Sequence, residues 1–286
     1  MKRPTRWRLI EALIASVLVV VGPATAGDGT RVEDVEFESH GAKLSGSIVF
    51  PGNQEVRAAV VFIHGSGKQE RNLALAERFA REGIAALVYD KRGAGKSGGF
   101  YEAEQNVGEK NIALLADDAA AAWTALARHP RLEGVPVGFA GISQAGWIAP
   151  LAAVRSTRAA FFVLWSGPVC KVSEEDIYSK FTADADGPIV PPYREALRSR
   201  TTPYVWPAFL GKDTDPSETL ARLSIPGLWI FSDNDGSVPV DLSIERLRSL
   251  QGAGHRYRYI LFSGLGHNNM DGSFAAATDW IKRQSK

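Results

Sequence analysis

The residues best suited to chemistry are a serine and a histidine that each follow a predicted buried strand. Ser143 stands in the segment 141–146 (GISQAG), between a strand ending near Ala140 and an Ala-rich helix. A serine hydroxyl is a weak nucleophile at neutral pH, so it must be raised toward a base at a tight turn. Small residues two positions either side allow such a turn, and Gly141 and Ala145 occupy these positions. The segment therefore predicts that Ser143 is a nucleophile for acyl transfer.

A base and an orienting acid follow later in the chain. His267 ends the Gly-rich segment 262–267 (FSGLGH) after the last predicted strand, where a base would face the nucleophile. The segment 230–239 (IFSDNDGSVP) offers two carboxylates, Asp233 and Asp235. We favour Asp235 because it precedes the turn that leads back into a helix. Asp233 is expected to brace the loop, as turn aspartates commonly do.

Acyl transfer also needs N–H donors for the developing oxyanion. The backbone N–H of Gln144, directly after the nucleophile, is one candidate. The second is expected from the segment 64–67 (HGSG), where two glycines let the backbone turn tightly. We predict the N–H of Ser66, with Gly65 as the alternative, and expect His64 to be structural.

Apolar runs and intervening helices define the elements that position these residues. The first two strands, 32–39 and 43–50, flank His40-Gly41 and predict an antiparallel hairpin. Nearly continuous apolar runs, typical of strands buried on both faces, cover 58–63, 84–89, 135–140, 159–165, 227–231 and 257–262. Helices are predicted at 72–82, 109–128, 144–154, 240–250 and 273–283. The alternation indicates an α/β fold with a mostly parallel, eight-stranded sheet flanked by helices, whose functional groups gather at the carboxyl ends of strands.

One interval departs from this alternation. Residues from about 168 to 225 contain no clear strand and many Pro, aromatic and charged residues, so we predict a small lid insertion in a domain spanning 27–286. Its aromatic residues either line an acyl pocket or pack the insertion together, and the packing interpretation is favoured. These residues are Tyr178, Phe181, Tyr193, Tyr204, Trp206 and Phe209.

The Ser143 segment is accompanied by 64–67, by 89–97 (YDKRGAGKS), by Asp235 and by Gly266-His267. Together these segments resemble the α/β-hydrolase superfamily, and the match runs from about His40 to the C-terminus. Residues 141–151 are similar to the branch of dienelactone-hydrolase-like and prolyl-oligopeptidase-like proteins and bacterial carboxylesterases. The resemblance implies that the acid lies between serine and histidine in the chain, and that catalysis needs no cofactor or metal. In the superfamily, the turn at 90–93 is mainly structural.

The first 26 residues predict export. Four basic residues precede an apolar stretch from Leu9 to Val21 and the small-residue triplet 24–26 (ATA), the pattern of a cleaved signal peptide. The uninterrupted apolar run is about half the roughly 20 residues of a membrane span, so an uncleaved anchor is the weaker alternative. The protein is therefore expected in the periplasm or secreted, without stable membrane insertion. Cys170 is the single cysteine, which leaves no internal disulfide and favours a structural role.

The net charge of +1 offers no basic field for nucleic acid and favours a small-molecule substrate. The sequence makes no prediction of oligomeric state. We expect a serine hydrolase that cleaves small carboxylic esters or thioesters through an acyl-enzyme. A peptidase or amidase of the same fold is the alternative, for which Glu174 and Glu175 could hold a peptide amino terminus. A non-catalytic binding protein is the third possibility and the least favoured.

Overall fold

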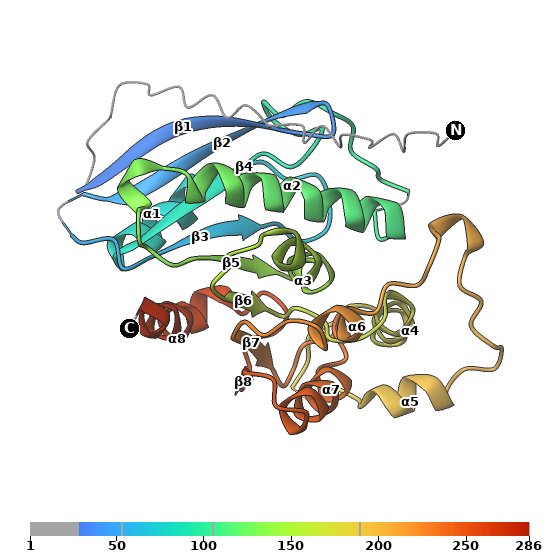
Figure 1. Ribbon diagram of the computed structural model, residues 1–286. Coiled ribbons are helices and arrows are strands. Elements are labelled where there is room, and N and C mark those ends of the chain that lie inside the picture. Colours follow the sequence, from blue (N-terminus) through green and yellow to red (C-terminus); the bar gives the residue numbers. More distant parts are fainter. Residues whose placement is uncertain (1–28, 53, 105, 189, 286) are drawn as a thin grey trace, which may run out of the picture.

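Eight strands form one sheet in the order β1-β2-β4-β3-β5-β6-β7-β8 (Figure 1). The computed structural model describes residues 29–52, 54–104, 106–188 and 190–285, and the predicted signal peptide lies outside them. The strands are β1 (Thr30–Ser39), β2 (Ala42–Pro51), β3 (Ala58–Ile63), β4 (Ile84–Tyr89), β5 (Val137–Ile142), β6 (Phe162–Trp165), β7 (Gly227–Ser232) and β8 (Tyr257–Phe262). The helices are α1 (Leu73–Arg81), α2 (Glu109–Ala127), α3 (Ala145–Arg155), α4 (Val172–Thr182), α5 (Tyr193–Arg198), α6 (Pro216–Leu220), α7 (Val240–Gly252) and α8 (Met270–Lys282). Single 3-10 turns lie at η1 (Pro130–Leu132), η2 (Ala208–Leu210) and η3 (Arg283–Ser285).

The predicted antiparallel edge is confirmed. β1 and β2 pair antiparallel, with Ser39 opposite Ala42 across the turn. His40 and Gly41 have φ values of 47° and 71°, the positive values that a tight hairpin with the right strand twist requires at both central positions. β2 is also antiparallel to β4, and the remaining pairs are parallel.

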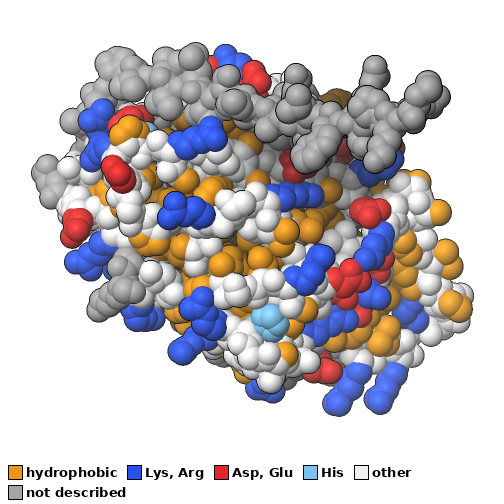
Figure 2. Space-filling model, viewed as in Figure 1, with side chains coloured by type: hydrophobic (Ala, Val, Ile, Leu, Met, Phe, Trp, Pro, Cys, Tyr) orange, Lys and Arg blue, Asp and Glu red, His pale blue; other side chains and the backbone are white. Residues whose placement is uncertain are grey.

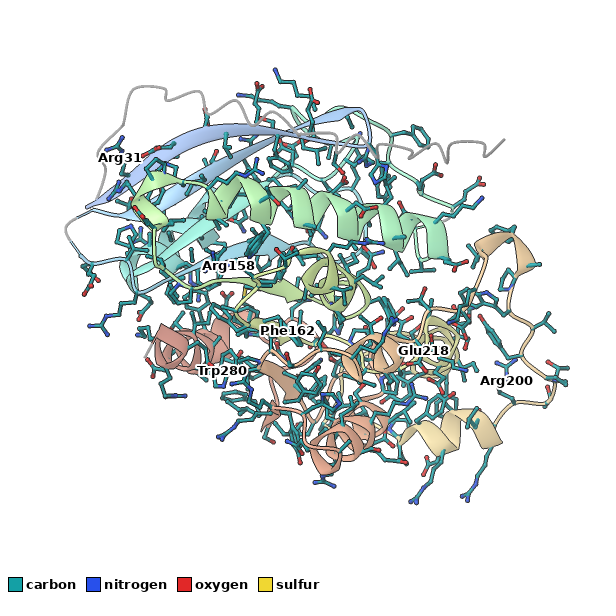
Figure 3. The ribbon with its side chains drawn as sticks, viewed as in Figure 1. Arg31, Arg158, Phe162, Arg200, Glu218 and Trp280 are labelled. Atoms are coloured by element: carbon teal, nitrogen blue, oxygen red, sulfur yellow. The ribbon has the colours of Figure 1, made fainter. Side chains whose placement is uncertain are left out.

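The apolar strands are buried because helices cover both faces of the sheet. Every residue of β3 and β4 is buried. On one face, the apolar sides of α1 and α8 pack in one cluster that includes Phe79 and Trp280. On the other face, α2, α3 and α7 pack in a second cluster that includes Phe162. Figure 3 shows Phe162 within the sheet and Trp280 on α8. The expected α/β fold is therefore confirmed.

Some element boundaries differ from the prediction. β5 begins at Val137 rather than Val135, because Pro136 has no N–H to give to a central ladder. It extends through Ile142, so Ser143 follows the strand directly. β6 begins at Phe162 rather than Ala159, whose N–H closes a turn onto the carbonyl of Ser156. The last helix begins one turn earlier, at Met270.

The interval between β6 and β7 forms an insertion that holds α4, α5, η2 and α6 (Figure 1). Tyr178 and Tyr193 are buried in a cluster of their own, as the packing interpretation expects. Figure 2 shows apolar side chains exposed on the insertion next to charged ones, and Phe209 is 66% exposed. Across residues 29–285, gaps excepted, no helix combines the length and apolar character needed to cross a membrane.

Candidate active site

Ser143 lies at a strained turn between β5 and α3. Its φ of 55° is in the left-handed region, which non-glycine residues rarely adopt away from functional sites. A Cβ on Gly141 would come within 2.5 Å of the Ala145 Cβ and 2.9 Å of the Ile63 carbonyl oxygen, so only glycine fits there. With Gly141 in place, the methyl group of Ala145 is accommodated, and it is fully buried. The turn thus lifts the serine hydroxyl out of the sheet.

The three residues predicted for catalysis lie in one hydrogen-bonded chain. His267 Nε2 is 3.0 Å from Ser143 Oγ, and His267 Nδ1 is 3.0 Å from each carboxylate oxygen of Asp235. This arrangement assigns the ring proton to Nδ1, which donates to Asp235, while Nε2 accepts from the Ser143 hydroxyl. Asp235 follows β7 and His267 follows β8, so the parallel sheet delivers all three residues to the same edge.

The environment of His267 favours its protonated form. Burial lowers the pKa of the imidazole, but the hydrogen bond to Asp235 and the charges of Asp235 and Asp186 together hold that pKa above 6.5. Asp235 itself is fully buried and also accepts from the N–H groups of Ser237 and Val238, at 2.9 and 3.0 Å. A fixed buried carboxylate beside the ring is suited to stabilise a protonated imidazole at this position.

The competing acid, Asp233, has a different place. It is exposed, and its carboxylate accepts from the Ser263 hydroxyl at 2.7 Å and from the Gly264 N–H at 3.0 Å. These hydrogen bonds lower the pKa of Asp233. Asp233 therefore braces the loop that carries His267, and of the two carboxylates only Asp235 contacts the imidazole.

Asp186, in the insertion between α4 and α5, contacts the loops that carry Asp235 and His267 and was not predicted. Its carboxylate accepts from the Gly236 N–H and from the His267 N–H, each at 3.0 Å. A Cβ on Gly236 would lie 2.1 Å from the Ala185 carbonyl oxygen, and one on Gly266 would lie 2.2 Å from Asp186 Oδ2. Glycines beside the acid and the histidine were a sign of close approach, but they do not say which segment approaches.

The segments predicted to bind the oxyanion meet at Ser143. An added Cβ on Gly65 would lie 3.5 Å from the Ser143 Cβ, in ordinary contact. Within the described residues, the backbone N–H groups of Ser66 and Gln144 donate to no protein acceptor. Unpaired donors beside the nucleophile are suited to a developing oxyanion. The ring of His64 is buried and its Nε2 lies 2.5 Å from the Tyr89 carbonyl oxygen, a structural contact.

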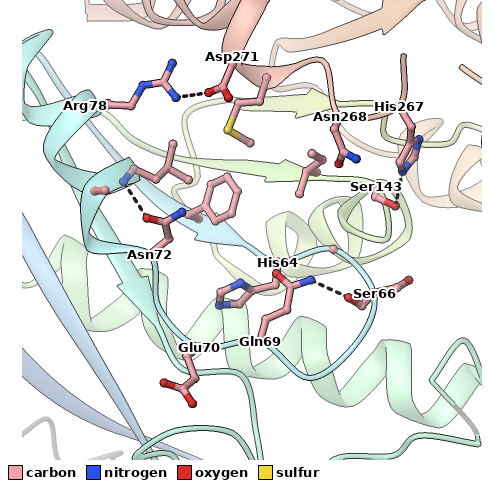
Figure 4. A pocket seen from close by; sticks show the side chains of 16 residues that line it. His64, Ser66, Gln69, Glu70, Asn72, Arg78, Ser143, His267, Asn268 and Asp271 are labelled. Atoms are coloured by element: carbon pink, nitrogen blue, oxygen red, sulfur yellow. Dashed lines mark hydrogen bonds and ion pairs between the residues drawn. The ribbon is translucent and has the colours of Figure 1, made fainter. Parts of the chain in front are cut away.

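A pocket of about 690 Å³ opens beside Ser143 and His267 (Figure 4). Its apolar lining comes from Phe62, Leu75, Ile142 and Met270. Arg78 and Asp271 form an ion pair across its far side. None of the six insertion aromatics lines this pocket, so its walls come from the β3–α1 region and the start of α8. Within the described chain, no group of three or more His, Cys, Asp or Glu side chains could hold a metal ion.

The sheet order and the Ser143–Asp235–His267 arrangement define an α/β-hydrolase of the serine-nucleophile class. The chain belongs to the serine aminopeptidase S33 family, whose sequence profile matches residues 54–202, including Ser66 and Ser143.

Two curated proteins match shorter segments. Over 104 residues the chain is 36% identical to polyketide transferase claH of Penicillium crustosum, covering 36% of this chain and 32% of that protein. Over 68 residues it is 40% identical to the quorum-quenching protein AidA of Acinetobacter baumannii strain MDR-ZJ06, covering 23% and 22%. The chain thus spans about a third or less of the length of these relatives.

Solved structures share the fold over most of the chain. Acetyl xylan esterase 1 from Thermoanaerobacterium sp. JW/SL YS485 has a TM-score of 0.66 at 14% identity, covering 96% of this chain and 88% of that one. Pyrococcus furiosus esterase Pf2001 has a TM-score of 0.66 at 18% identity, covering 94% and 98%. Pyrococcus horikoshii acylaminoacyl peptidase has a TM-score of 0.60 at 18% identity, covering 91% and 40%. At these identities the likeness concerns the fold.

Proposed function

We propose that this protein is an exported serine hydrolase that cleaves small carboxylic esters or thioesters through an acyl-enzyme intermediate. The observation that carries the proposal is the chain of 3.0 Å contacts from Asp235 through His267 to Ser143, next to an open pocket. Similar folds in an acetyl xylan esterase and in esterase Pf2001 support ester cleavage.

The geometry supports a two-stage reaction. Ser143 Oγ attacks the carbonyl carbon of the ester while its proton passes to His267 Nε2, and the carbonyl oxygen becomes an oxyanion. As the tetrahedral intermediate collapses, His267 gives the proton to the oxygen or sulfur atom of the departing alcohol or thiol, and the acyl group stays on Ser143. Water then attacks the acyl-enzyme in the same way. Its proton passes to His267, which returns it to Ser143 Oγ as the acid is released. Asp235 holds the imidazole in the required tautomer throughout.

Peptide or amide cleavage is the second candidate, because the family is named for a serine aminopeptidase and an acylaminoacyl peptidase shares the fold. A free peptide amino terminus would need an unpaired negative charge. Glu174 already forms an ion pair with Arg246 at 2.7 Å. Burial, followed by the charges of Asp184 and Asp176, raises the pKa of Glu175 to about 8, so this carboxyl is largely neutral at pH 7. Both features favour the ester.

A substrate panel distinguishes the candidates. We expect purified protein to hydrolyse p-nitrophenyl acetate and butyrate, and to leave aminoacyl p-nitroanilides nearly untouched under the same conditions. Ser143→Ala serves as the background for both series. Faster release of p-nitroaniline than of p-nitrophenol would transfer the proposal to the peptidase.

A further inference from the structure

Lys91 places a buried ammonium group behind the candidate oxyanion site. The residue follows β4, is 3% exposed, and donates from Nζ to the Gly65 carbonyl oxygen and to Gln144 Oε1, each at 2.9 Å. No carboxylate within the described residues forms an ion pair with it. Burying an ammonium group without a counter-charge is costly, so its hydrogen bonds must be strong to keep it there.

The first of these hydrogen bonds orients a peptide. The Gly65 carbonyl and the Ser66 N–H belong to one peptide unit, and all described peptide bonds are trans, so the two groups point in opposite directions. Lys91 Nζ holds the carbonyl on one side of this peptide. The Ser66 N–H is thereby turned to the other side, where Gly65, Ser66 and Ser143 line the pocket (Figure 4).

The second hydrogen bond fixes the residue after the nucleophile. Gln144 is fully buried, its Oε1 accepts from Lys91, and its Nε2 donates to the Asn106 carbonyl oxygen at 2.8 Å. Both ends of the amide are therefore held, and so is the backbone N–H of Gln144. Lys91 thus links the two segments that are to supply the oxyanion donors. Gly65 lies 26 residues before Lys91 in the chain, and Gln144 lies 53 residues after it.

We infer that Lys91 is a positioning residue for the oxyanion-binding N–H groups of Ser66 and Gln144. The inference rests on the proposed function. Besides fixing geometry, the positive charge polarises the Gly65–Ser66 peptide, which makes the Ser66 N–H a stronger donor. It also contributes a favourable potential where negative charge develops. Burial lowers the pKa of Lys91 to about 8, so this charge is lost as the pH rises above that value.

The test compares Lys91→Met with Lys96→Met on p-nitrophenyl acetate between pH 5 and 10. Lys96 lies in the same turn, but its side chain is exposed and makes no hydrogen bond or ion pair with any residue that the structure describes. We expect Lys91→Met to lower kcat about 10- to 100-fold, somewhat less than loss of a whole oxyanion donor, with KM within about threefold. The wild-type kcat should decline above about pH 8, and this decline should be absent from Lys91→Met. Lys96→Met should match the wild type in both respects.

A folded Lys91→Met enzyme with wild-type kcat, or one that keeps the alkaline decline, would overturn the inference. If Lys91→Met does not fold, Gln144→Met removes one acceptor of the ammonium and keeps the backbone N–H. The decline of kcat at alkaline pH should then begin at a lower pH than in the wild type. A decline at the wild-type pH would contradict the inference about Lys91. An inactive wild type contradicts the proposed function instead. In that event crystals of wild type and Lys91→Met decide the positioning role, which fails if the Gly65–Ser66 peptide keeps its orientation without Lys91.

Discussion

Asp186 accepts a hydrogen bond of 3.0 Å from the backbone N–H of His267, and its second carboxylate oxygen accepts one of equal length from Gly236, next to Asp235. One side chain of the insertion therefore ties together the loops that carry the acid and the base. Its negative charge also helps to hold the pKa of His267 above 6.5.

Asp186→Asn tests this clamp. An amide can accept only one of the two N–H groups and turns a donor toward the other, so we expect kcat to fall about tenfold as the loops shift. The base must be neutral to accept a proton, so kcat/KM rises with pH through the His267 pKa. Removing a charge that raises this pKa should move the acid limb to lower pH. Asp184→Asn is the matched control, because Asp184 is exposed and its φ of 54° suits asparagine. If the acid limb of the kcat/KM profile lies at the same pH in Asp186→Asn as in the wild type, Asp186 has a structural role only.

The two loop aspartates should respond very differently to the same change. Asp235→Asn removes the acceptor that fixes the Nδ1–H tautomer of His267, and we expect kcat to fall by about 10³ to 10⁴. Asp233→Asn weakens only the hydrogen bonds from Ser263 and Gly264, which brace the loop that carries His267, and should stay within about threefold of wild type. Steady-state kinetics with thermal unfolding as the folding check gives the ranking. The reverse ranking would make Asp233 the acid.

The glycine two residues before the nucleophile should be irreplaceable, and the alanine two residues after it replaceable. Gly141→Ala drives a methyl group into the Ala145 Cβ and the Ile63 carbonyl oxygen, so we expect about 1–3 kcal/mol of lost stability together with lost activity. Ala145→Gly keeps a small residue at this position and should cost about 0.5–1 kcal/mol from the greater freedom of glycine, with activity within about threefold. Urea unfolding of both variants measures the difference. A Gly141→Ala protein as stable as Ala145→Gly would contradict the tight turn.

The export proposal predicts a mature protein that begins at Gly27. The basic start, the short apolar stretch and residues 24–26 (ATA) motivate cleavage after Ala26. Mass spectrometry of protein from the extracytoplasmic fraction should give a mass lacking residues 1–26. An intact chain that requires detergent for extraction would instead support the uncleaved anchor.

Strands that are buried on both faces of the sheet were predictable from the sequence. The apolar runs of β3 and β4 have the predicted bounds, because strands covered on both faces must be apolar throughout. β5 was displaced by two residues because Pro136 interrupts an otherwise apolar run. Helices α5 and α6 span only six and five residues, and the polar residues of α4 leave it without a clear apolar period, so the sequence indicated only an insertion there.

The candidate site also has a part that was predictable from the sequence and a part that was not. Ser143, Asp235 and His267 each follow a strand, and the carboxyl ends of parallel strands lie at one edge of the sheet. The contributions of Asp186 and Lys91 depend on tertiary contacts instead. Asp186 reaches Gly236 across 50 residues and His267 across 81, and Lys91 lies in a turn that resembles a structural motif of the superfamily. No local pattern in the sequence specifies these contacts.

The most direct measurement is the site of covalent labelling by a fluorophosphonate, which reacts with a serine activated by a neighbouring base. Peptide mapping by mass spectrometry should find one adduct per chain, on Ser143. We expect no adduct on folded Ser143→Ala and labelling slowed by several orders of magnitude in His267→Ala, because a serine without its base is a weak nucleophile. Well-folded wild-type protein that stays unlabelled, or that carries the adduct on another residue, would contradict Ser143 as the nucleophile.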